Sequence, residues 1–237
     1  MPRRLLASIA SLALAIALSG CAGMQKTGRS GEPSADADIT GSISEVAAKR
    51  SETTTDWRGV VSWYAEFNAA LPTGYGLSYC SGFGCMHRTV VRADGGNGVE
   101  LAAIMAAGQA SAAAERDAVD AAITWFERKA IPLMGGVIDE PGTDSKDFKI
   151  LGQTDCIDEA ANTTTMLIHL QNKGMLKYHT VARPIARGGL MVPHVTAVLR
   201  DRETGVLWAV DSWVNAGGER PAVLTLDRWD EWMGTGH

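Results

Sequence analysis

Residues 153–174, QTDCIDEAANTTTMLIHLQNKG, decide the fold of this chain. Thr154 or Asp155 can cap a helix that runs to about Asn172, and Gly174 is a typical residue just beyond a helix end. The sequence after this helix alternates in the way that strands do. It predicts strands over 177–183, 191–200, 206–213 and 222–226, with a last helical turn over 227–233. One long helix followed by a run of strands indicates an α+β fold with an antiparallel sheet.

The N-terminal half of the chain is mainly helical in pattern. Apolar residues at helical spacing predict a helix from Asp56 to Leu71. Residues 98–131 are rich in alanine and predict two helices divided at Gly108, because glycine weakens a helix interior. Between these segments, a Gly-rich stretch holds a short strand at Thr89–Arg92. The expected arrangement is a set of N-terminal helices and a central helix packed on an antiparallel sheet.

The first residues read as an export signal. A cationic start, MPRR, precedes an apolar stretch from Leu5 to Leu18 that is too short to span a bilayer comfortably. The tetrad Leu18-Ser-Gly-Cys21 then resembles the lipobox of bacterial lipoproteins, in which the cysteine is acylated. We therefore predict a lipoprotein signal peptide over 1–20 and a lipid, such as palmitate, on Cys21. The alternative is an ordinary signal peptide with a chance cysteine.

Composition separates a tether from one globular domain. Residues 21–55 contain almost no large apolar side chains, so they cannot offset the entropy of ordering. They predict a flexible tether, and 56–237 predict a single domain facing the periplasm, with an outer-membrane location as one reading of the residues after Cys21. The net charge is −5, and the sequence as a whole has no excess of basic residues. We therefore expect no nucleic-acid partner. The expected membrane contact is the N-terminal lipid.

The four cysteines divide by context. In an oxidising compartment Cys80 and Cys85, five residues apart in YCSGFGC, favour a disulfide over half of a metal site. Cys156 then has no obvious disulfide partner, and an odd thiol in an exported protein is a candidate reactive group. It opens a helix, where backbone N–H groups and a positive partial charge lower the pKa of a thiol.

His194 and Asp211 complete a candidate catalytic set with Cys156. A histidine can take the thiol proton, and a carboxylate can orient the imidazole. A hairpin register that places His194 opposite Asp211 and Arg200 opposite Gly205 brings both side chains to one sheet face. The alternative is a packed Cys156, a half-buried His194 and an Asp211 that only caps a turn. The order of the three residues favours catalysis.

The segments QTDCIDEAAN, PHVTAVLRD and WAVDSW resemble the transglutaminase-like cysteine protease superfamily, and within it the bacterial transglutaminase-like cysteine proteinases. The resemblance covers residues 150–215. It implies a papain-like fold with Cys156 as nucleophile, His194 as base and Asp211 as the residue that orients the base. For the oxyanion, the backbone N–H of Cys156 is one candidate donor and the side chain of Gln153 a second.

The resemblance also bears on cofactors and partners. Proteinases of this family typically carry an acidic residue directly after the cysteine, and neighbouring acids help to bind calcium; Ile157 stands there in this chain. We expect no cofactor, with calcium held by Asp155, Asp158 and Glu159 as the alternative. The expected activity is cleavage of a peptide or amide bond in a protein or peptide substrate. Alternatives are a cell-wall peptidase, a transglutaminase, and a non-catalytic binding or scaffold lipoprotein.

Overall fold

The computed structural model describes residues 55–142, 145–188 and 194–231, all within one compact unit. The predicted signal peptide, Cys21 and the predicted tether except Thr55 lie outside these residues. The helices are α2 (Trp57–Glu66), α3 (Gly95–Ala106), α4 (Ala112–Ala130), α5 (Cys156–Asn172) and α6 (Leu226–Glu231). Short 3-10 helices cover Ala107–Ala110, Ile131–Met134 and Ser145–Asp147. The strands are β1 (Gly76–Ser81), β2 (His87–Arg92), β3 (His179–Arg187), β4 (His194–Asp201), β5 (Leu207–Asp211) and β6 (Ala222–Thr225).

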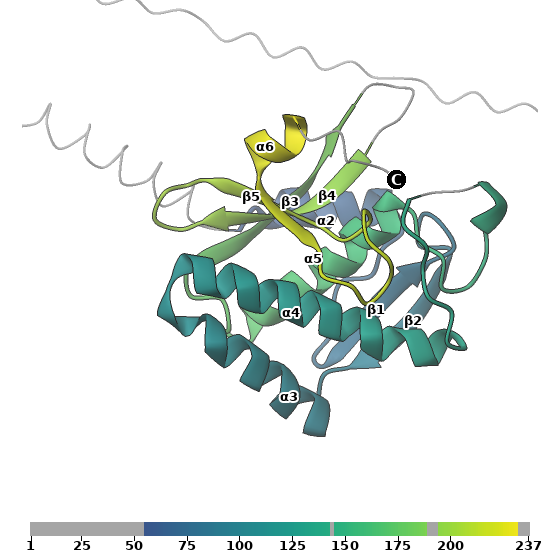
Figure 1. Cartoon of the computed structure of the whole chain (residues 1–237), viewed down its shortest axis with the longest axis horizontal. Helices are drawn as coiled ribbons and strands as arrows, with labels where there is room; N and C mark the ends of the chain where they lie inside the picture. The colour runs from purple at the N-terminus through teal and green to yellow at the C-terminus, as the bar shows by residue number, and fades with distance from the viewer. Residues whose placement is uncertain (1–54, 143–144, 189–193, 232–237) are drawn as a thin grey trace, which may run out of the picture. The chain divides into compact units, whose positions relative to one another are not determined.

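The strands form two antiparallel sheets. β1 and β2 pair as a hairpin, and the larger sheet has the order β3-β4-β5-β6 (Figure 1). β3 carries an irregularity between Ala182 and Ile185, where Pro184 has no N–H to give to the ladder. A mixed helical and antiparallel architecture is the predicted α+β class. Within the described residues no helix is long and apolar enough to cross a bilayer.

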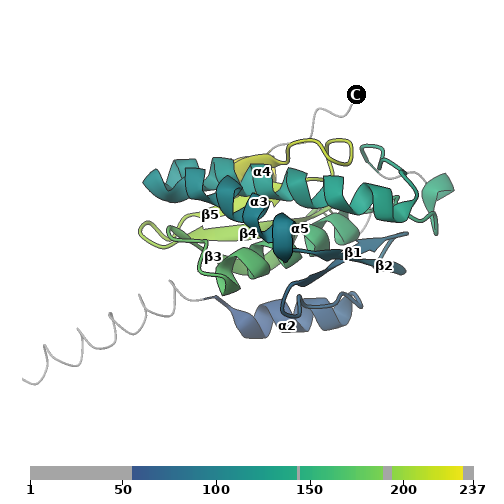
Figure 2. The ribbon, with the colours of Figure 1, turned by 90° about the horizontal axis from the view of Figure 1, so that it is seen from below.

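Helix α5 is the centre of the core. Every residue from Asp158 to Leu170 is buried, so the helix is enclosed on all sides rather than on one face. One face meets the core side of β4 through Val195, Ala197 and Leu199. On another, Tyr64 of α2 donates its hydroxyl to the Ala161 carbonyl at 3.0 Å. Figure 2 shows α2 and α4 on opposite sides of α5.

Most helix boundaries follow the predicted pattern. The central helix begins after Asp155, ends at Asn172 and is followed by Gly174 at a φ of 68°. Residues 98–131 do form two helices, with Gly108 buried at their junction. The predicted helix from Asp56 is too long, because it ends at Glu66. There the Ala69 N–H closes on the Tyr64 carbonyl, and Asn68 takes a left-handed backbone conformation.

The register of β4 and β5 differs from the prediction by two residues. Ala197 pairs with Val210 and Arg200 pairs with Leu207, so His194 is not opposite Asp211. The cause is the turn: Asp201 accepts two backbone N–H groups from within the loop that follows, and its own N–H donates to the Val206 carbonyl. Because side chains alternate with a period of two, this shift leaves His194 and Asp211 on the same face.

Candidate functional site

Helix α5 presents Cys156 as its first residue. Asp155 is the N-cap, and its carboxylate accepts the Asp158 N–H at 2.8 Å while the Asp158 carboxylate accepts the Asp155 N–H in return. This reciprocal capping box fixes the first turn and therefore the direction of the Cys156 side chain. Cys156 is half-buried and belongs to no disulfide.

His194 and Asp211 are in direct contact. His194 Nε2 lies 2.6 Å from Asp211 Oδ2, and the histidine is only 7% exposed and the aspartate 2% exposed. The contact runs diagonally across the β4–β5 hairpin, as the shifted register requires. An ionised carboxylate only accepts hydrogen bonds, so it favours the tautomer with the proton on Nε2 and a lone pair on Nδ1. That Nδ1 is buried and has no hydrogen-bond partner among the described residues.

Two tryptophans hold this pair in place. Trp229 of α6 is fully buried and donates its indole N–H to Asp211 Oδ2 at 2.6 Å. Its ring lies 5.5 Å from the His194 ring, and the Trp213 ring lies 4.6 Å from it, centroid to centroid. Asp211 is thus oriented by two N–H donors, and the imidazole is confined by aromatic rings. The role of Trp229 could not be predicted from sequence, because nothing in the DRWDEW segment links its indole to Asp211.

The side chain of Cys156, from the start of α5, lies against the first residues of β4. The backbone N–H of Val195, the residue after His194, forms a hydrogen bond to the sulfur that lowers the pKa of the thiol. Burial has the larger effect and raises the pKa of Cys156 to about 11, with further increases from the charges of Asp155 and Asp211. The expected lowering of this pKa by the helix N-terminus is therefore wrong, since desolvation outweighs it.

The side chain of Gln153 forms hydrogen bonds with the neighbouring 138–140 loop. Its side-chain amide donates to the Ile138 carbonyl at 3.0 Å, and its Oε1 accepts the Glu140 N–H at 3.3 Å. Through these bonds it holds the 138–140 loop beside the start of α5. One of the two amide hydrogens is occupied in this way, and the oxyanion role of Gln153 stays a prediction.

A group of buried carboxylates lies behind Cys156. Glu159 accepts the hydroxyls of Thr154 and Ser212, Asp139 accepts the Thr154 N–H at 2.6 Å, and Glu127 accepts the Gly218 N–H at 2.7 Å. All three acids are at most 4% exposed. Burial raises the pKa of each, for Asp139 to about 8, and repulsion from neighbouring carboxylates adds to the effect.

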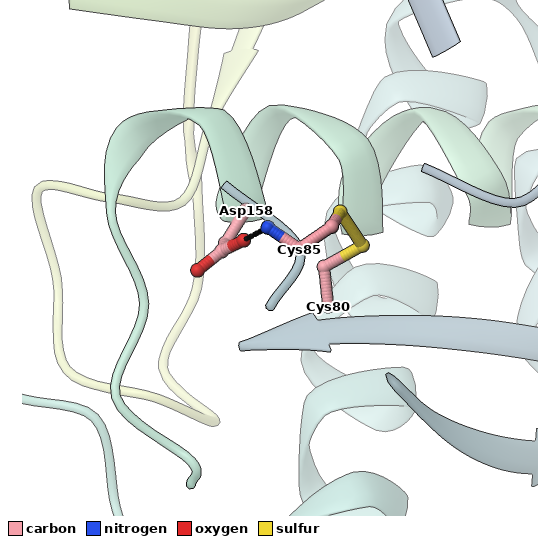
Figure 3. Close-up of side chains that lie close together, drawn as sticks. All are labelled: Cys80, Cys85 and Asp158. Carbon is pink, nitrogen blue, oxygen red and sulfur yellow. Dashed lines mark hydrogen bonds between the residues drawn. A yellow bond between two sulfur atoms is a disulfide. The ribbon is translucent and has the colours of Figure 1, made fainter. Parts of the chain in front are cut away.

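The predicted disulfide is confirmed. Cys80 and Cys85 are bonded, with Cα atoms 4.5 Å apart, and they close a small ring over residues 80–85. Asp158 points at this ring, and its carboxylate accepts the Cys85 N–H (Figure 3). Both sulfurs and the Asp158 carboxylate lie close enough to share a metal ion, but disulfide sulfurs are not the thiolates that bind one.

The acids expected to hold calcium do not fit that ion. Calcium needs six to eight oxygens directed at one point. Asp158 faces the backbone N–H groups of the disulfide ring, Glu159 faces two hydroxyls, and Asp155 caps α5. Their carboxylates are thus occupied by separate donors within the fold.

His179 has a structural partner that its sequence context does not reveal. Its Nδ1 lies 2.9 Å from Glu115 Oε1, and both side chains are completely buried. The same carboxylate also accepts the backbone N–H groups of Lys177, Tyr178 and His179. The pair joins α4 to the start of β3 and is separate from Cys156.

The structure thus brings His194 and Asp211 into contact, with the Cys156 thiol next to them at the backbone of Val195. The disulfide ring touches the helix that carries the thiol. Comparison with known proteins adds no assignment: no family model, no curated protein and no solved structure matches this chain.

Proposed function

We propose that this protein is an envelope-anchored thiol hydrolase of the papain-like, transglutaminase-like type, which cleaves a peptide or amide bond through Cys156, His194 and Asp211. The observation that carries the proposal is the buried 2.6 Å contact between His194 and Asp211. Nδ1 of the same imidazole is buried, with no hydrogen-bond partner among the described residues. A buried polar atom without a partner is uncommon and calls for an explanation.

The geometry supports transfer of the thiol proton to His194. Because burial raises the pKa of Cys156 to about 11, the resting thiol is neutral at pH 7. In the attack, the proton moves from sulfur to Nδ1 of His194 as the sulfur bonds to the carbonyl carbon. Asp211 stabilises the imidazolium that results. His194 therefore acts as a general base in this mechanism. It does not form a thiolate–imidazolium ion pair with Cys156 before the substrate is attacked.

The remaining steps return the enzyme to its starting state. The imidazolium gives its proton to the leaving amine, the carbon–nitrogen bond breaks and a thioester remains on Cys156. Water then attacks the thioester while His194 takes its proton, and the acid product and the thiol are released. The Cys156 backbone N–H opens α5 and is a candidate donor to the oxyanion. An amine in place of water would give transamidation by the same steps.

One observation favours a non-catalytic binding or scaffold lipoprotein as the second candidate. A raised thiol pKa is what an inert, packed cysteine shows. In that case His194 and Asp211 would serve only to join β4, β5 and α6.

Peptide-resolved alkylation of Cys156 by iodoacetamide, followed from pH 5 to 10, separates the two candidates. If His194 accepts the thiol proton, the wild type reacts measurably below pH 8 and H194A loses that reactivity. D211A, which removes the oxygen that accepts the Nε2 proton of His194, should lose most of it. R200K, on the same strand and away from the site, is the matched control. Reactivity that is undetectable below pH 8 and identical in all four proteins up to pH 10 would reject the catalytic proposal.

A further inference from the structure

The disulfide ring over residues 80–85 is attached to the start of α5 at four points around Cys156. Gly82 donates its N–H to the Gln153 carbonyl at 2.7 Å. Phe83 and Cys85 donate theirs to the two oxygens of Asp158 at 2.7 and 2.5 Å. Gly84 also gives a backbone hydrogen bond to the Asp155 carboxylate, although burial raises the pKa of that acid overall. These contacts reach residues 153, 155 and 158, on both sides of Cys156.

A second pair of bonds fixes the ring one helical turn further along α5. Asn162 follows Asp158 by four residues and so lies on the same helix face. Its Oδ1 accepts the Cys80 N–H at 2.6 Å, and its Nδ2 donates to the Cys80 carbonyl at 3.0 Å. Asp158 and Asn162 are both buried, at 0% and 1% exposure. The first two turns of α5 therefore bind the backbone of the ring through Asp158, which accepts hydrogen bonds, and Asn162, which both accepts and donates them.

The ring has a conformation that its residues would not adopt alone. Phe83 and Cys85 have φ angles of 72° and 56°, in the left-handed region that is costly for residues other than glycine. Such conformations persist where surrounding structure enforces them, often at functional sites. Here the enforcing contacts are the covalent closure at Cys80–Cys85 and the carboxylate of Asp158 (Figure 3).

We propose that the Cys80–Cys85 ring and Asp158 form one positioning unit, which holds the first turn of α5 so that Cys156 faces His194. The inference deepens the proposed function and rests on it. Asp158 and the disulfide are positioning residues, because they touch the turn that bears the thiol and not the reacting atoms. The carboxylate suits this role because it accepts two backbone N–H groups at once. An asparagine would present an N–H₂ group to one of those donors.

The test measures Cys156 alkylation at 20 °C in D158N, in the disulfide-free C80A/C85A and in the triple variant. D158N and C80A/C85A should each lower the His194-dependent rate at pH 7 by about tenfold, since a displacement of about 1 Å can cost on the order of 100-fold. D117N, which removes an exposed carboxylate from α4, should retain the wild-type pH profile. Because the two changes act on one unit, the triple variant should lose little more than either alone.

A purely structural role predicts a different result. In that case the variants would melt at lower temperature but keep the wild-type pH profile at 20 °C, and this outcome overturns the proposal. Fully additive losses in the triple variant also overturn it. If C80A/C85A does not fold, D158N with its disulfide intact carries the test alone.

The proposal remains testable if the wild type shows no His194-dependent reactivity and the proposed function fails. Hydrogen exchange of the backbone N–H groups at Cys156, Ile157 and Asp158 then reports directly on the first turn. Exchange at least tenfold faster in D158N and in C80A/C85A than in D117N supports the positioning unit. Unchanged exchange in both variants refutes it.

Discussion

The buried acids behind Cys156 should make this protein less stable as pH rises, and D139N should remove much of that dependence. Burial raises the pKa of Asp139 to about 8, well above its value in an unfolded chain, and Glu159 and Asp158 add repulsion. The folded state therefore holds this proton more tightly than the unfolded state. The stability that it contributes is complete below about pH 4 and is lost as pH rises through 8.

The magnitude follows from this difference in pKa. Between pH 5 and pH 8, a carboxyl with a pKa near 8 when folded and about 3.9 when unfolded costs about 4 kcal/mol of stability, at 1.36 kcal/mol per pKa unit. For a domain of this size, 1 kcal/mol changes the melting temperature by roughly 2–4 °C. D139N keeps the oxygen that accepts the Thr154 N–H and removes the charge. Between pH 5 and pH 8, its melting temperature should therefore fall about 8–16 °C less than that of the wild type.

Differential scanning calorimetry of both proteins at pH 5, 6.5 and 8 measures this difference. Comparing the two proteins matters because other groups titrate in the same range. Burial lowers the pKa of His169, which therefore adds stability as pH rises. That contribution is common to both proteins and cancels. Parallel curves for wild type and D139N, or a variant that loses more stability than the wild type at pH 8, would refute the reasoning.

Three further substitutions test individual contacts. E115A removes a buried carboxylate that accepts three backbone N–H groups and lies 2.9 Å from His179 Nδ1. The free energy of unfolding in urea should fall by about 3–5 kcal/mol, and a loss below 1 kcal/mol would contradict this expectation. W229F keeps an aromatic ring but removes one donor to Asp211, which should cost about 1–2 kcal/mol and reduce Cys156 alkylation at pH 7; unchanged alkylation would show that the indole does not orient Asp211. G205A forces an alanine to a φ of 74° in the β4–β5 turn, where a new Cβ meets nothing within 4 Å, so chemical unfolding should show a loss of about 1 kcal/mol from the backbone alone, and a loss above 3 kcal/mol would indicate an unseen clash.

Local signals predicted the central helix and its surroundings well. The Asp155 cap, the run of helix formers and Gly174 all act within a few residues of the helix ends, so the sequence contains the whole cause. Strand β1 was not predicted, because its segment GLSYCS begins with glycine and contains no β-branched residue. Its stability comes from pairing with β2 and from Asn162 and Asp158, which lie about 80 residues further along the chain.

In the candidate site, the sheet face of His194 and Asp211 was predictable from sequence, whereas the register of their strands was not. A hydrophobic pattern of period two determines which face a side chain takes, and it placed His194 and Asp211 on one face even though the register was wrong by two residues. The exact pairing depended on Asp201 closing the turn, which is a local hydrogen-bond preference that the pattern does not encode.

The pKa of Cys156 could not be predicted from its position at a helix start, because its sign depends on burial. A helix N-terminus stabilises a thiolate by at most about 1–2 kcal/mol, whereas desolvation of a buried ion costs several. The effect of the helix N-terminus can be predicted from local sequence, whereas the cost of desolvation depends on how the folded chain packs around the thiol. With desolvation dominant, a neutral thiol needs a base within reach, and the imidazole beside it has one buried nitrogen with no partner among the described residues. The raised pKa therefore makes any catalysis by Cys156 more dependent on His194, and H194A is the variant in which that dependence must appear.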